Sequence, residues 1–295
     1  MTEIKRVLLT GGTGFVGSAL TRALIDAGYQ VTILTRQARS DLGDIRYINA
    51  LPTTTEAWPF DAIINLAGEN LFAKRWNPTQ KQRLRDSRIQ LTEQLAAGIK
   101  ASPTIQRFIS ASAIGYYGAS DAPALDENAT AGDDFAAHLC RDWEACALQA
   151  EESTHVQRLR IGVVLGDGGA LDNLLPPFKL GLGGPIGSGK QGFSWIHISD
   201  LVKLLMACLR GELNANVINA VAPQPVSNKT FSKALGRALH RPAVIPMPPR
   251  ALRLMLGEVS ALLTTGQFVV PKAALEEGFQ FRFETIDSAL NELLN

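Results

Sequence analysis

The sequence predicts an α/β fold, in which a doubly wound parallel sheet is followed by a smaller C-terminal α+β lobe. Short, mostly apolar runs alternate with longer amphipathic segments through the first half of the chain, which is typical of βαβ units and a parallel sheet. After Leu165 the sequence becomes rich in glycine and proline, so a lobe of loops and short elements is expected there. We therefore predict a sheet domain over residues 1–165, to which strands can return from 190–222, and a second lobe over 166–295.

Five runs are predicted to be strands, because each is mostly apolar, as expected of strands that are buried on both faces of a sheet. They span residues 4–10, 31–36, 62–67, 107–112 and 156–165. The clearest helix begins after Asn77, whose side-chain oxygen can cap it, and Pro78 suits the first helical position. Four further elements are expected in the second lobe: a helix from near Ser199, a strand at 217–220, a helix over 227–240 and a last helix from Thr285.

Composition places the chain among neutral globular proteins. Hydrophobic residues make up 46% and charged residues 19% of its 295 residues, which is enough apolar material for a sizeable core. The 29 basic and 28 acidic side chains nearly cancel and form no basic stripe, so neither nucleic acid nor an anionic membrane is an expected partner. No run approaches the roughly 18 apolar residues that a membrane-spanning helix needs.

The cysteine and histidine patterns exclude two further classes of protein. The three cysteines are odd in number and contain no CxxC pair, so neither a disulfide framework nor a zinc knuckle is expected. The four histidines are far apart and match no metal-ligand spacing, so no metal site is expected. A reducing compartment fits this cysteine usage, and the N-terminal residues are typical of a strand rather than a secretory signal, so we expect a cytoplasmic protein.

The strongest local motif is TGGTGFVG at residues 10–17, which lies between the first strand and an amphipathic helix. Glycine permits a tight turn and lets backbone N–H groups approach a pyrophosphate at the positive end of the helix. We therefore predict a Rossmann-type dinucleotide site. The contacts expected from this turn are Gly11, Thr13, Gly14, Phe15 and Val16. The alternative is a glycine turn that binds no ligand.

The end of the second strand indicates which dinucleotide is preferred. Arg36 follows Gly17 by 19 residues and stands where an NAD enzyme places an acid for the ribose 2′-hydroxyl. A guanidinium there can pair with a 2′-phosphate, whereas a carboxylate would repel it, so NADP(H) is the predicted cofactor. In the alternative, Arg36 is an ordinary surface arginine and Asp41 or Asp44 binds the ribose.

Further motifs make the chain similar to a known family. The glycine spacing of the first turn, NLAG at 65–68 and YG at 117–118 resemble an extended short-chain dehydrogenase/reductase. A closer resemblance, covering nearly the whole chain, is to the atypical "epimerase family" branch. The motifs that carry it are NLAGEN at 65–70, RW at 75–76, SRI at 87–89, GYYG at 115–118, LLPPF at 174–178, LGLGGPIGSG at 180–189 and WIHISD at 195–200. Residues 243–294 are similar to the small C-terminal domain of that branch.

This resemblance implies cofactor contacts beyond the glycine turn. They are Thr35, Arg36, Leu66, Ala67, Gly68 and Arg88. Arg88 also falls on the apolar stripe of its helix, four residues after Leu84, so it should point inward and require an anionic partner. A buried ion pair with one of the chain's own carboxylates is the alternative.

The chain departs from the usual catalytic pattern of short-chain reductases, which carry Tyr-x-x-x-Lys on the helix after the fifth strand. Residues 133–144 occupy that place and contain neither tyrosine nor lysine. An apolar stripe takes their place, formed by Phe135, Leu139, Trp143 and Cys146. The usual serine position also falls on Ala113, one residue after Ser112. The ordinary route for the carbonyl proton is therefore missing.

The candidates for a substitute catalytic residue are Ser112, Tyr116 or Tyr117, Glu69 and His197. Each has a structural alternative. The tyrosines can pack with their hydroxyls bonded to backbone, and Ser112 can simply support the turn. Glu69 can cap a helix or pair with Arg75, and His197 can be a hydrogen-bonded histidine of the second lobe.

Two functions remain open. The first is an NADP(H)-dependent oxidoreductase or epimerase that acts on a small carbonyl or hydroxyl substrate with a non-standard proton donor. The second is a non-catalytic NADP(H)-binding module whose second lobe reports redox state to a partner protein. We expect a monomer or a homodimer; the resemblance implies that a dimer would form through helices equivalent to residues 78–101 and 133–150.

Overall fold

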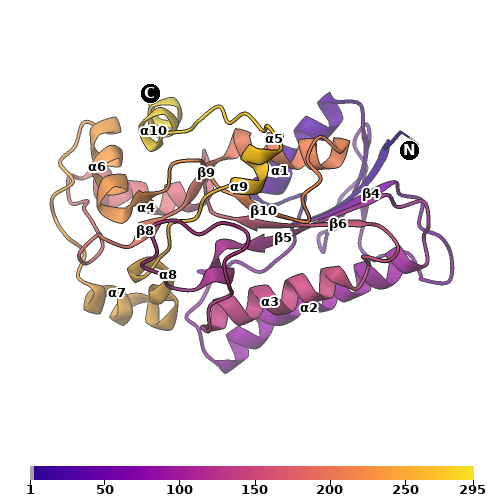
Figure 1. The fold of residues 1–295 in the computed structure, drawn as a ribbon, viewed down its shortest axis with the longest axis horizontal. Helices are drawn as coiled ribbons and strands as arrows, with labels where there is room; N and C mark the ends of the chain where they lie inside the picture. Colours follow the sequence, from indigo (N-terminus) through magenta and orange to yellow (C-terminus); the bar gives the residue numbers. More distant parts are fainter. Residues whose placement is uncertain (1–2) are drawn as a thin grey trace.

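The structure is a computed structural model that describes residues 3–295, and its centre is a seven-stranded parallel sheet (Figure 1). The strand order is β10-β6-β5-β4-β1-β2-β3. After β3 the chain crosses to the other side of β1, so a topological switch point lies between β1 and β4, where doubly wound sheets bind ligands. The strands are β1 (Arg6–Thr10), β2 (Gln30–Leu34), β3 (Ile45–Ile48), β4 (Ala62–Asn65), β5 (Arg107–Ala113), β6 (His155–Ile161) and β10 (Val217–Ala220).

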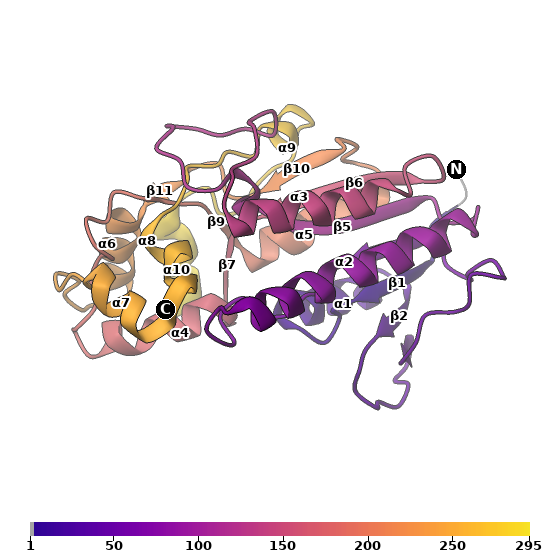
Figure 2. The same cartoon turned by 90° about the horizontal axis from the view of Figure 1, so that it is seen from below.

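Helices cover both faces of this sheet (Figure 2). On one face lie α2 (Pro78–Lys100) and α3 (Phe135–Leu148), and on the other α1 (Phe15–Asp26) and α5 (Ile198–Arg210). Alternate residues of β1 point to opposite faces of the sheet. Val7 and Leu9 pack on the face covered by α1 and α5, whereas Leu8 packs on the face covered by α2. The sheet is therefore buried on both faces, which confirms the predicted α/β architecture.

The second lobe packs short elements around its own core. Leu171, Trp195, Phe231 and Leu290 come from four different elements and share this core. The lobe contains β7 (Val163–Gly166), α4 (Gly169–Lys179), β8 (Gly192–Phe193), β9 (Trp195–His197), β11 (Val226–Ser227), α6 (Asn228–Ala238), α7 (Pro249–Leu256), η2 (Gly257–Ser260), α8 (Ala261–Thr264) and α10 (Ile286–Leu294). In contrast, α9 (Lys272–Glu276) packs against β10, and its Ala274 belongs to the core of the large sheet. Across residues 3–295, no helix has both the length and the apolarity needed to cross a bilayer.

Several strands differ from the sequence-based expectation: one predicted strand is divided into β6 and β7, and β3 and the short strands β8, β9 and β11 were not expected. The run predicted as one strand over 156–165 forms β6 and β7, because the chain breaks at Gly162. A Cβ atom there would lie 2.7 Å from Cγ1 of Val221 and 2.8 Å from the carbonyl oxygen of Ser194, so only glycine fits. β7 then leaves the large sheet and pairs with β9. β3 was not predicted, since it is a four-residue edge strand with no buried residue.

Other elements begin where their capping residues predict. The Oδ1 atom of Asn77 accepts a hydrogen bond of 2.7 Å from the backbone N of Gln80, at the start of α2. Thr285 caps α10 in the same way, through the N–H of Ser288 at 3.3 Å. β10 has the predicted bounds and joins the large sheet beside β6, so the segment after residue 190 contributes a strand to it.

The α2 helix closely approaches the loop between β3 and β4 at Gly98. The Trp58 side chain is 1% exposed, and a Cβ atom at position 98 would lie 2.0 Å from its Cζ2 atom. The indole cannot easily retreat, because its Nε1 donates to the carbonyl oxygen of Thr53 at 3.1 Å and the Trp58 backbone N donates to Ser102 Oγ at 2.7 Å.

We predict that Gly98→Ala lowers the free energy of unfolding by about 1–3 kcal/mol, because overpacking against Trp58 outweighs the gain in helix propensity. Denaturant titration measures this quantity. The control is Gln94→Ala at an exposed position of the same helix, which should change stability by less than about 0.5 kcal/mol. A Gly98→Ala protein as stable as the wild type would contradict the close packing.

Candidate cofactor and active site

The turn between β1 and α1 touches the β4–α2 loop, which we define as residues 66–77. Gly11 has a φ of +71°, and a Cβ atom there would lie 2.7 Å from the carbonyl carbon and oxygen of Leu66. A Cβ atom at Gly17 would lie 2.1 Å from the carbonyl oxygen of Gly11. Both positions therefore require glycine, and the turn and the loop meet at the carboxyl ends of β1 and β4.

A buried chain of polar contacts holds the start of this loop. The Oγ1 atom of Thr10 accepts a hydrogen bond of 3.2 Å from the backbone N of Ala67 and donates to Oδ1 of Asn65 at 2.6 Å. The Asn65 amide donates in turn to Thr92 Oγ1 at 2.9 Å, and Nε1 of Trp143 donates to the same hydroxyl at 3.0 Å. These contacts join β1, β4, α2 and α3 beneath the switch point.

The N-terminus of α1 is open to an anion. Gly14 is its N-cap residue, no side chain caps it, and its first turn holds no acidic residue. The first N–H groups of a helix, here including those of Phe15 and Val16, have no partner within it, and the helix dipole adds partial positive charge. Thr13 and Gly14 are exposed beside them. This arrangement can bind a pyrophosphate.

Phe15 links the same turn to the second lobe. Its ring lies against the loop between β7 and α4. A Cβ atom at Gly166 would lie 2.8 Å from the ring's Cζ atom, and one at Gly169 would lie 2.8 Å from Cδ1. The second lobe therefore covers the first turn of α1, and the Phe15 side chain packs against that lobe beside the predicted cofactor site.

The end of β2 presents an unpaired cation. Arg36 is exposed and makes no hydrogen bond or ion pair with any residue of the described chain. Thr35 before it is buried, and its Oγ1 accepts a hydrogen bond of 3.2 Å from the backbone N of Gln37. Of the two alternative ribose ligands, Asp41 uses Oδ1 to accept from the backbone N of Tyr47 at 2.8 Å, and Asp44 lies beside Val31 at the opposite end of β2. The free charge at this strand end is therefore positive, as a 2′-phosphate requires.

Arg88 is a largely buried cation held by neutral groups. Its Nη2 donates to the carbonyl oxygen of Glu69 at 3.0 Å, and its Nη1 donates to that of Leu84 at 3.1 Å. Its guanidinium also lies over Gly68, where a Cβ atom would be 2.9 Å from Cζ. Burial lowers the pKa of this guanidinium. It pairs with no carboxylate among residues 3–295, so the alternative of an internal ion pair is wrong for this chain.

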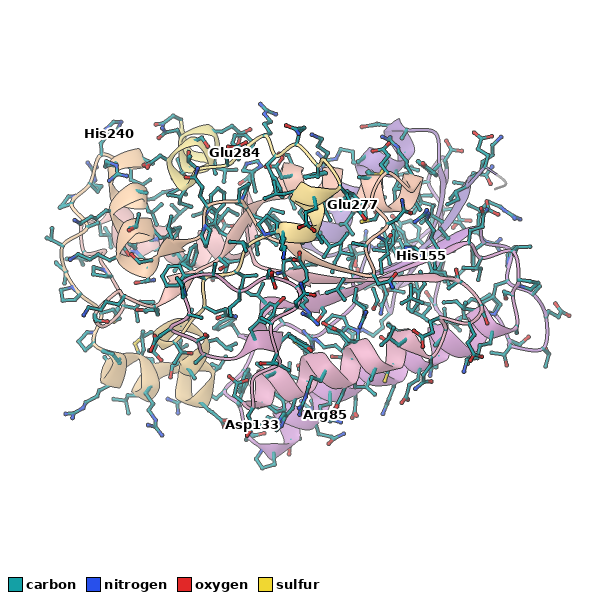
Figure 3. The ribbon with its side chains drawn as sticks, viewed as in Figure 1. Arg85, Asp133, His155, His240, Glu277 and Glu284 are labelled. Carbon is teal, nitrogen blue, oxygen red and sulfur yellow. The ribbon has the colours of Figure 1, made fainter. Side chains whose placement is uncertain are left out.

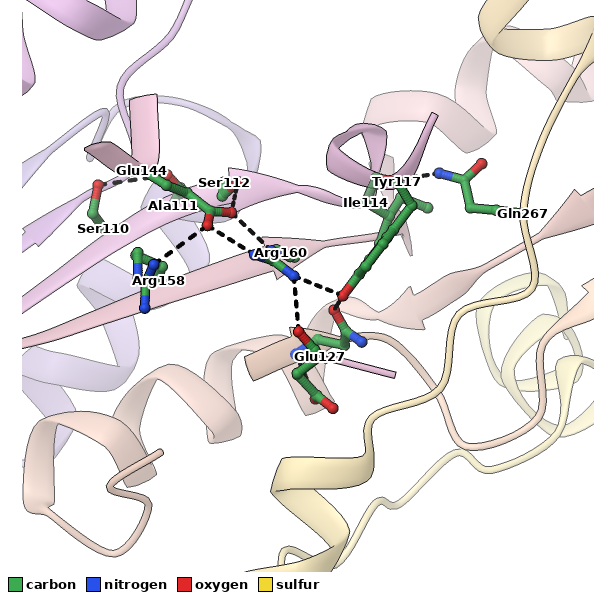
Figure 4. A network of polar contacts seen from close by, with 11 residues as sticks. Ser110, Ala111, Ser112, Ile114, Tyr117, Glu127, Glu144, Arg158, Arg160 and Gln267 are labelled. Carbon is green, nitrogen blue, oxygen red and sulfur yellow. Dashed lines mark hydrogen bonds and ion pairs between the residues drawn. The ribbon is translucent and has the colours of Figure 1, made fainter. Parts of the chain in front are cut away.

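A buried ion pair occupies the space between α3 and the carboxyl ends of β5 and β6 (Figure 4). Glu144 is 4% exposed and accepts two bonds from Arg160, which is 3% exposed: one from Nε at 2.8 Å and one from Nη2 at 3.0 Å. Arg160 Nη1 also donates to Tyr117 Oη at 3.0 Å, and Tyr117 donates to Asn219 Oδ1 at 2.7 Å. Burial disfavours the charged guanidinium, but the hydrogen bonds to Glu144 outweigh it and raise the pKa of Arg160.

Ser112 belongs to this network. Its side chain is buried, and Oγ donates to Glu144 Oε1 at 2.7 Å, so its hydroxyl proton is already in a hydrogen bond. On the same helix as Glu144, burial raises the pKa of the Cys140 thiol to about 11, which leaves it protonated at neutral pH. Sequence reasoning did not identify Glu144 or Arg160. The sequence does contain a signal for this pair: Glu144 is a charged residue among the apolar residues of its helix, and Arg160 is a charged residue within a mostly apolar strand.

The two tyrosines after β5 have different environments, although both lie on η1 (Ile114–Tyr117). Tyr117 is buried with its hydroxyl bonded to side chains of the network. Tyr116 is partly exposed, and the Arg160 guanidinium lies 3.4 Å from the centroid of its ring. Its hydroxyl bonds to no residue of the described chain. Of the two phenols, only that of Tyr116 is free to meet a ligand.

The remaining two catalytic candidates have partners of their own. Glu69 Oε1 accepts from Gln80 Nε2 at 2.9 Å, whereas Arg75 bonds to carbonyl oxygens of the second lobe, so these two residues do not pair. His197 is 2% exposed, and its Nδ1 accepts from the Ser199 backbone N at 3.2 Å. Its Nε2 meets Glu292 at 3.0 Å, and burial lowers its pKa. His197 is thus a buried, hydrogen-bonded histidine of the second lobe, which is the structural alternative to a catalytic role.

Within residues 3–295, no three His, Cys, Asp or Glu side chains come together as a metal site would require. The histidines are widely separated: His240 lies on the second lobe, whereas His155 is the first residue of β6 in the large sheet (Figure 3).

We expect Glu144→Gln to lower the free energy of unfolding by about 3–5 kcal/mol, because it leaves the buried Arg160 without its charged partner. Urea denaturation of both proteins provides the measurement. Glu152→Gln removes an exposed carboxylate near the end of α3 and should have almost no effect. Equal stabilities for wild type and Glu144→Gln would show that the ion pair does not hold this end of the sheet.

Comparison with known proteins agrees with this geometry. Two family models match the chain: the NAD dependent epimerase/dehydratase family over residues 7–220 and a domain of unknown function (DUF1731) over 247–293. A chloroplastic homologue of epimerase family protein SDR39U1 from Arabidopsis thaliana is 38% identical over 301 residues, covering 98% of this chain and 86% of the relative. SDR39U1 from Bos taurus is 41% identical over 297 residues, covering 98% and 99%.

The same relationship is seen in three dimensions. A crystal structure of human epimerase family protein SDR39U1 (isoform 2) with NADPH matches with a TM-score of 0.88 at 38% identity, covering 98% of this chain and 99% of the human chain. The resemblance stated from the motifs is thereby confirmed. The chain belongs to the NAD dependent epimerase/dehydratase family.

Proposed function

We propose that this chain binds NADP(H) at the carboxyl ends of β1, β2 and β4. The observation that carries the proposal is the open N-terminus of α1 next to the glycine turn, with an unpaired Arg36 at the end of β2. The N–H groups of Phe15 and Val16 would donate to the pyrophosphate, and Arg36 would pair with the 2′-phosphate. The NADPH in the structure of the human relative supports this choice of cofactor.

The partners of Arg88 are consistent with the same proposal. A buried guanidinium that bonds only to carbonyls and a hydroxyl gains free energy from an anionic partner. Leu66, Ala67 and Gly68 lie between Arg88 and the glycine turn, so they would line the site.

We further propose that the protein is an oxidoreductase or epimerase acting on a small carbonyl or hydroxyl substrate. Bound NADP(H) would supply or accept the hydride. The chain itself must then move a proton at the substrate oxygen. Ser112 is buried and its proton is bound to Glu144, whereas the Tyr116 hydroxyl is unpaired. We assign the proton transfer to Tyr116, because its hydroxyl is free to meet a ligand and the Arg160 guanidinium, 3.4 Å from the ring centroid, holds the ring in place.

A non-catalytic role as an NADP(H)-binding module is the second candidate function. The observation that favours it is the composition of α3, the helix on which related reductases carry tyrosine and lysine: it contains neither residue, and its buried Glu144 is paired with Arg160. In this role the second lobe would respond to the cofactor and would not catalyse a reaction.

We also propose a cytoplasmic location and a monomeric or homodimeric state. All three cysteines are free and buried, which suits a reducing compartment. The packed pair of α2 and α3 would form the face of a homodimer.

Titration of the cofactor-stripped protein with NADP, NADPH, NAD and NADH tests the cofactor proposal. NADP(H) should bind more tightly than NAD(H), and Arg36→Ala should weaken NADPH binding by about 10–100-fold, the range for loss of a charge-assisted contact. Arg46→Ala, which removes another exposed arginine nearby, should leave the affinity unchanged. Failure of all four nucleotides to bind would refute the proposal.

Screening carbonyl compounds for oxidation of bound NADPH tests the catalytic proposal. With a compound that reacts, Tyr116→Phe should reduce the rate by about 100-fold or more, the usual contribution of a general acid, without changing NADPH affinity. Tyr29→Phe is the matched control, because Tyr29 lies far along the chain at the α1–β2 turn. A full rate in Tyr116→Phe would exclude Tyr116, and a broad screen with no turnover would favour the non-catalytic module.

A further inference from the structure

The β4–α2 loop is attached to the cofactor side of the molecule at its beginning. Leu66 closely approaches Gly11 of the glycine turn, and the backbone N of Ala67 is bonded to Thr10. The next two residues are held by Arg88, whose guanidinium lies over Gly68 and donates to the carbonyl oxygen of Glu69. A ligand that moves the turn or the Arg88 side chain therefore acts directly on this loop.

The far end of the same loop is attached to the second lobe. Arg75 Nε donates to the carbonyl oxygen of Met255 at 3.0 Å, and Arg75 Nη2 donates to that of Leu254. Both carbonyls belong to the last turn of α7, where the helix dipole favours a cation. The stem of Arg75 also lies against Gly257, whose φ is +71°.

An ion pair also joins the same two parts of the chain. Lys81, in the first turn of α2, lies 2.5 Å from Oε1 of Glu258, which follows α7 in η2. Lys81 is also 5.0 Å from the centroid of the Phe135 ring at the start of α3. Arg75 and Lys81 thus connect the segment after β4 to residues 254–258 through charged groups.

The α7 helix has few other anchors. Leu252 is the only buried residue among its eight. Leu254 is 78% exposed and Met255 is 65% exposed, although both are large and apolar. A helix with so little buried surface belongs to the parts of a protein that open at low free-energy cost. The contacts of Arg75 with the last turn of α7 are therefore a large share of what holds this helix in place, and Lys81 anchors the η2 turn that follows it.

We propose that the β4–α2 loop couples occupancy of the cofactor site to the order of α7 and η2. This inference rests on the proposed binding of NADP(H). An anionic ligand gives Arg88 the partner it lacks and packs against Leu66, Ala67 and Gly68, which orders the loop. The ordered loop holds Arg75 on the carbonyls of α7. By linkage, the free energy by which the ligand stabilises the ordered α7 equals the free energy by which the contacts of α7 strengthen ligand binding.

Amide hydrogen exchange of the full chain, with and without saturating NADPH, tests this coupling. NADPH should slow exchange in peptides from residues 249–260 by about 5-fold or more, the lower end of usual coupling factors. Arg75→Ala should abolish that slowing and weaken NADPH binding by the same factor. Lys81→Ala should reduce both effects. Lys74→Ala is the matched control, because this neighbouring exposed cation has no partner in the described chain, and it should behave as the wild type.

The outcomes separate this inference from the cofactor proposal. If the wild type binds NADPH but residues 249–260 exchange at an unchanged rate, the coupling is refuted and the cofactor proposal stands. If Arg75→Ala keeps the NADPH-dependent slowing while its melting curve shows a folded protein, the route through Arg75 is refuted. If NADPH does not bind to the wild type, both proposals fail.

Discussion

The close contact between the glycine turn and the start of the β4–α2 loop is the constraint on which this end of the molecule depends. Because Gly11 and Gly17 lack side chains, the turn can lie on the carboxyl end of β4 and direct the N-terminus of α1 toward the switch point. The Thr10–Asn65–Thr92 contacts then fix that arrangement from within the core. The N-terminus of α1, which lacks a side-chain cap, is thereby held next to the start of the β4–α2 loop, where the largely buried Arg88 lies over Gly68.

The Glu144–Arg160 pair determines what the neighbouring catalytic end can do. It binds Ser112 and Tyr117 into the core and leaves Tyr116 as the accessible phenol, stacked on the same guanidinium. A buried charge pair of this kind is expensive to disrupt and holds its surroundings in one arrangement. In the proposed reaction, the proton must therefore move through a group other than Ser112 or Tyr117.

Local sequence predicted most of the fold because the strands are buried on both faces and the helices carry capping residues, as Asn77 and Thr285 illustrate. It missed β3, whose partly exposed edge position leaves no apolar run, and it joined β6 to β7 because the crowding at Gly162 comes from distant residues. The glycine turn and the position of Arg36 at the end of the second strand could be predicted from the local sequence. The partnership of Glu144 with Arg160 could not, since 16 positions separate residues that only the tertiary fold brings together.

A crystal structure of this chain grown with NADPH would test the central claim most directly. The account predicts pyrophosphate oxygens within about 2.7–3.2 Å of the backbone nitrogens at the start of α1, and the 2′-phosphate against the Arg36 guanidinium. NADPH bound elsewhere on the molecule, or a 2′-phosphate that meets no basic side chain, would contradict it.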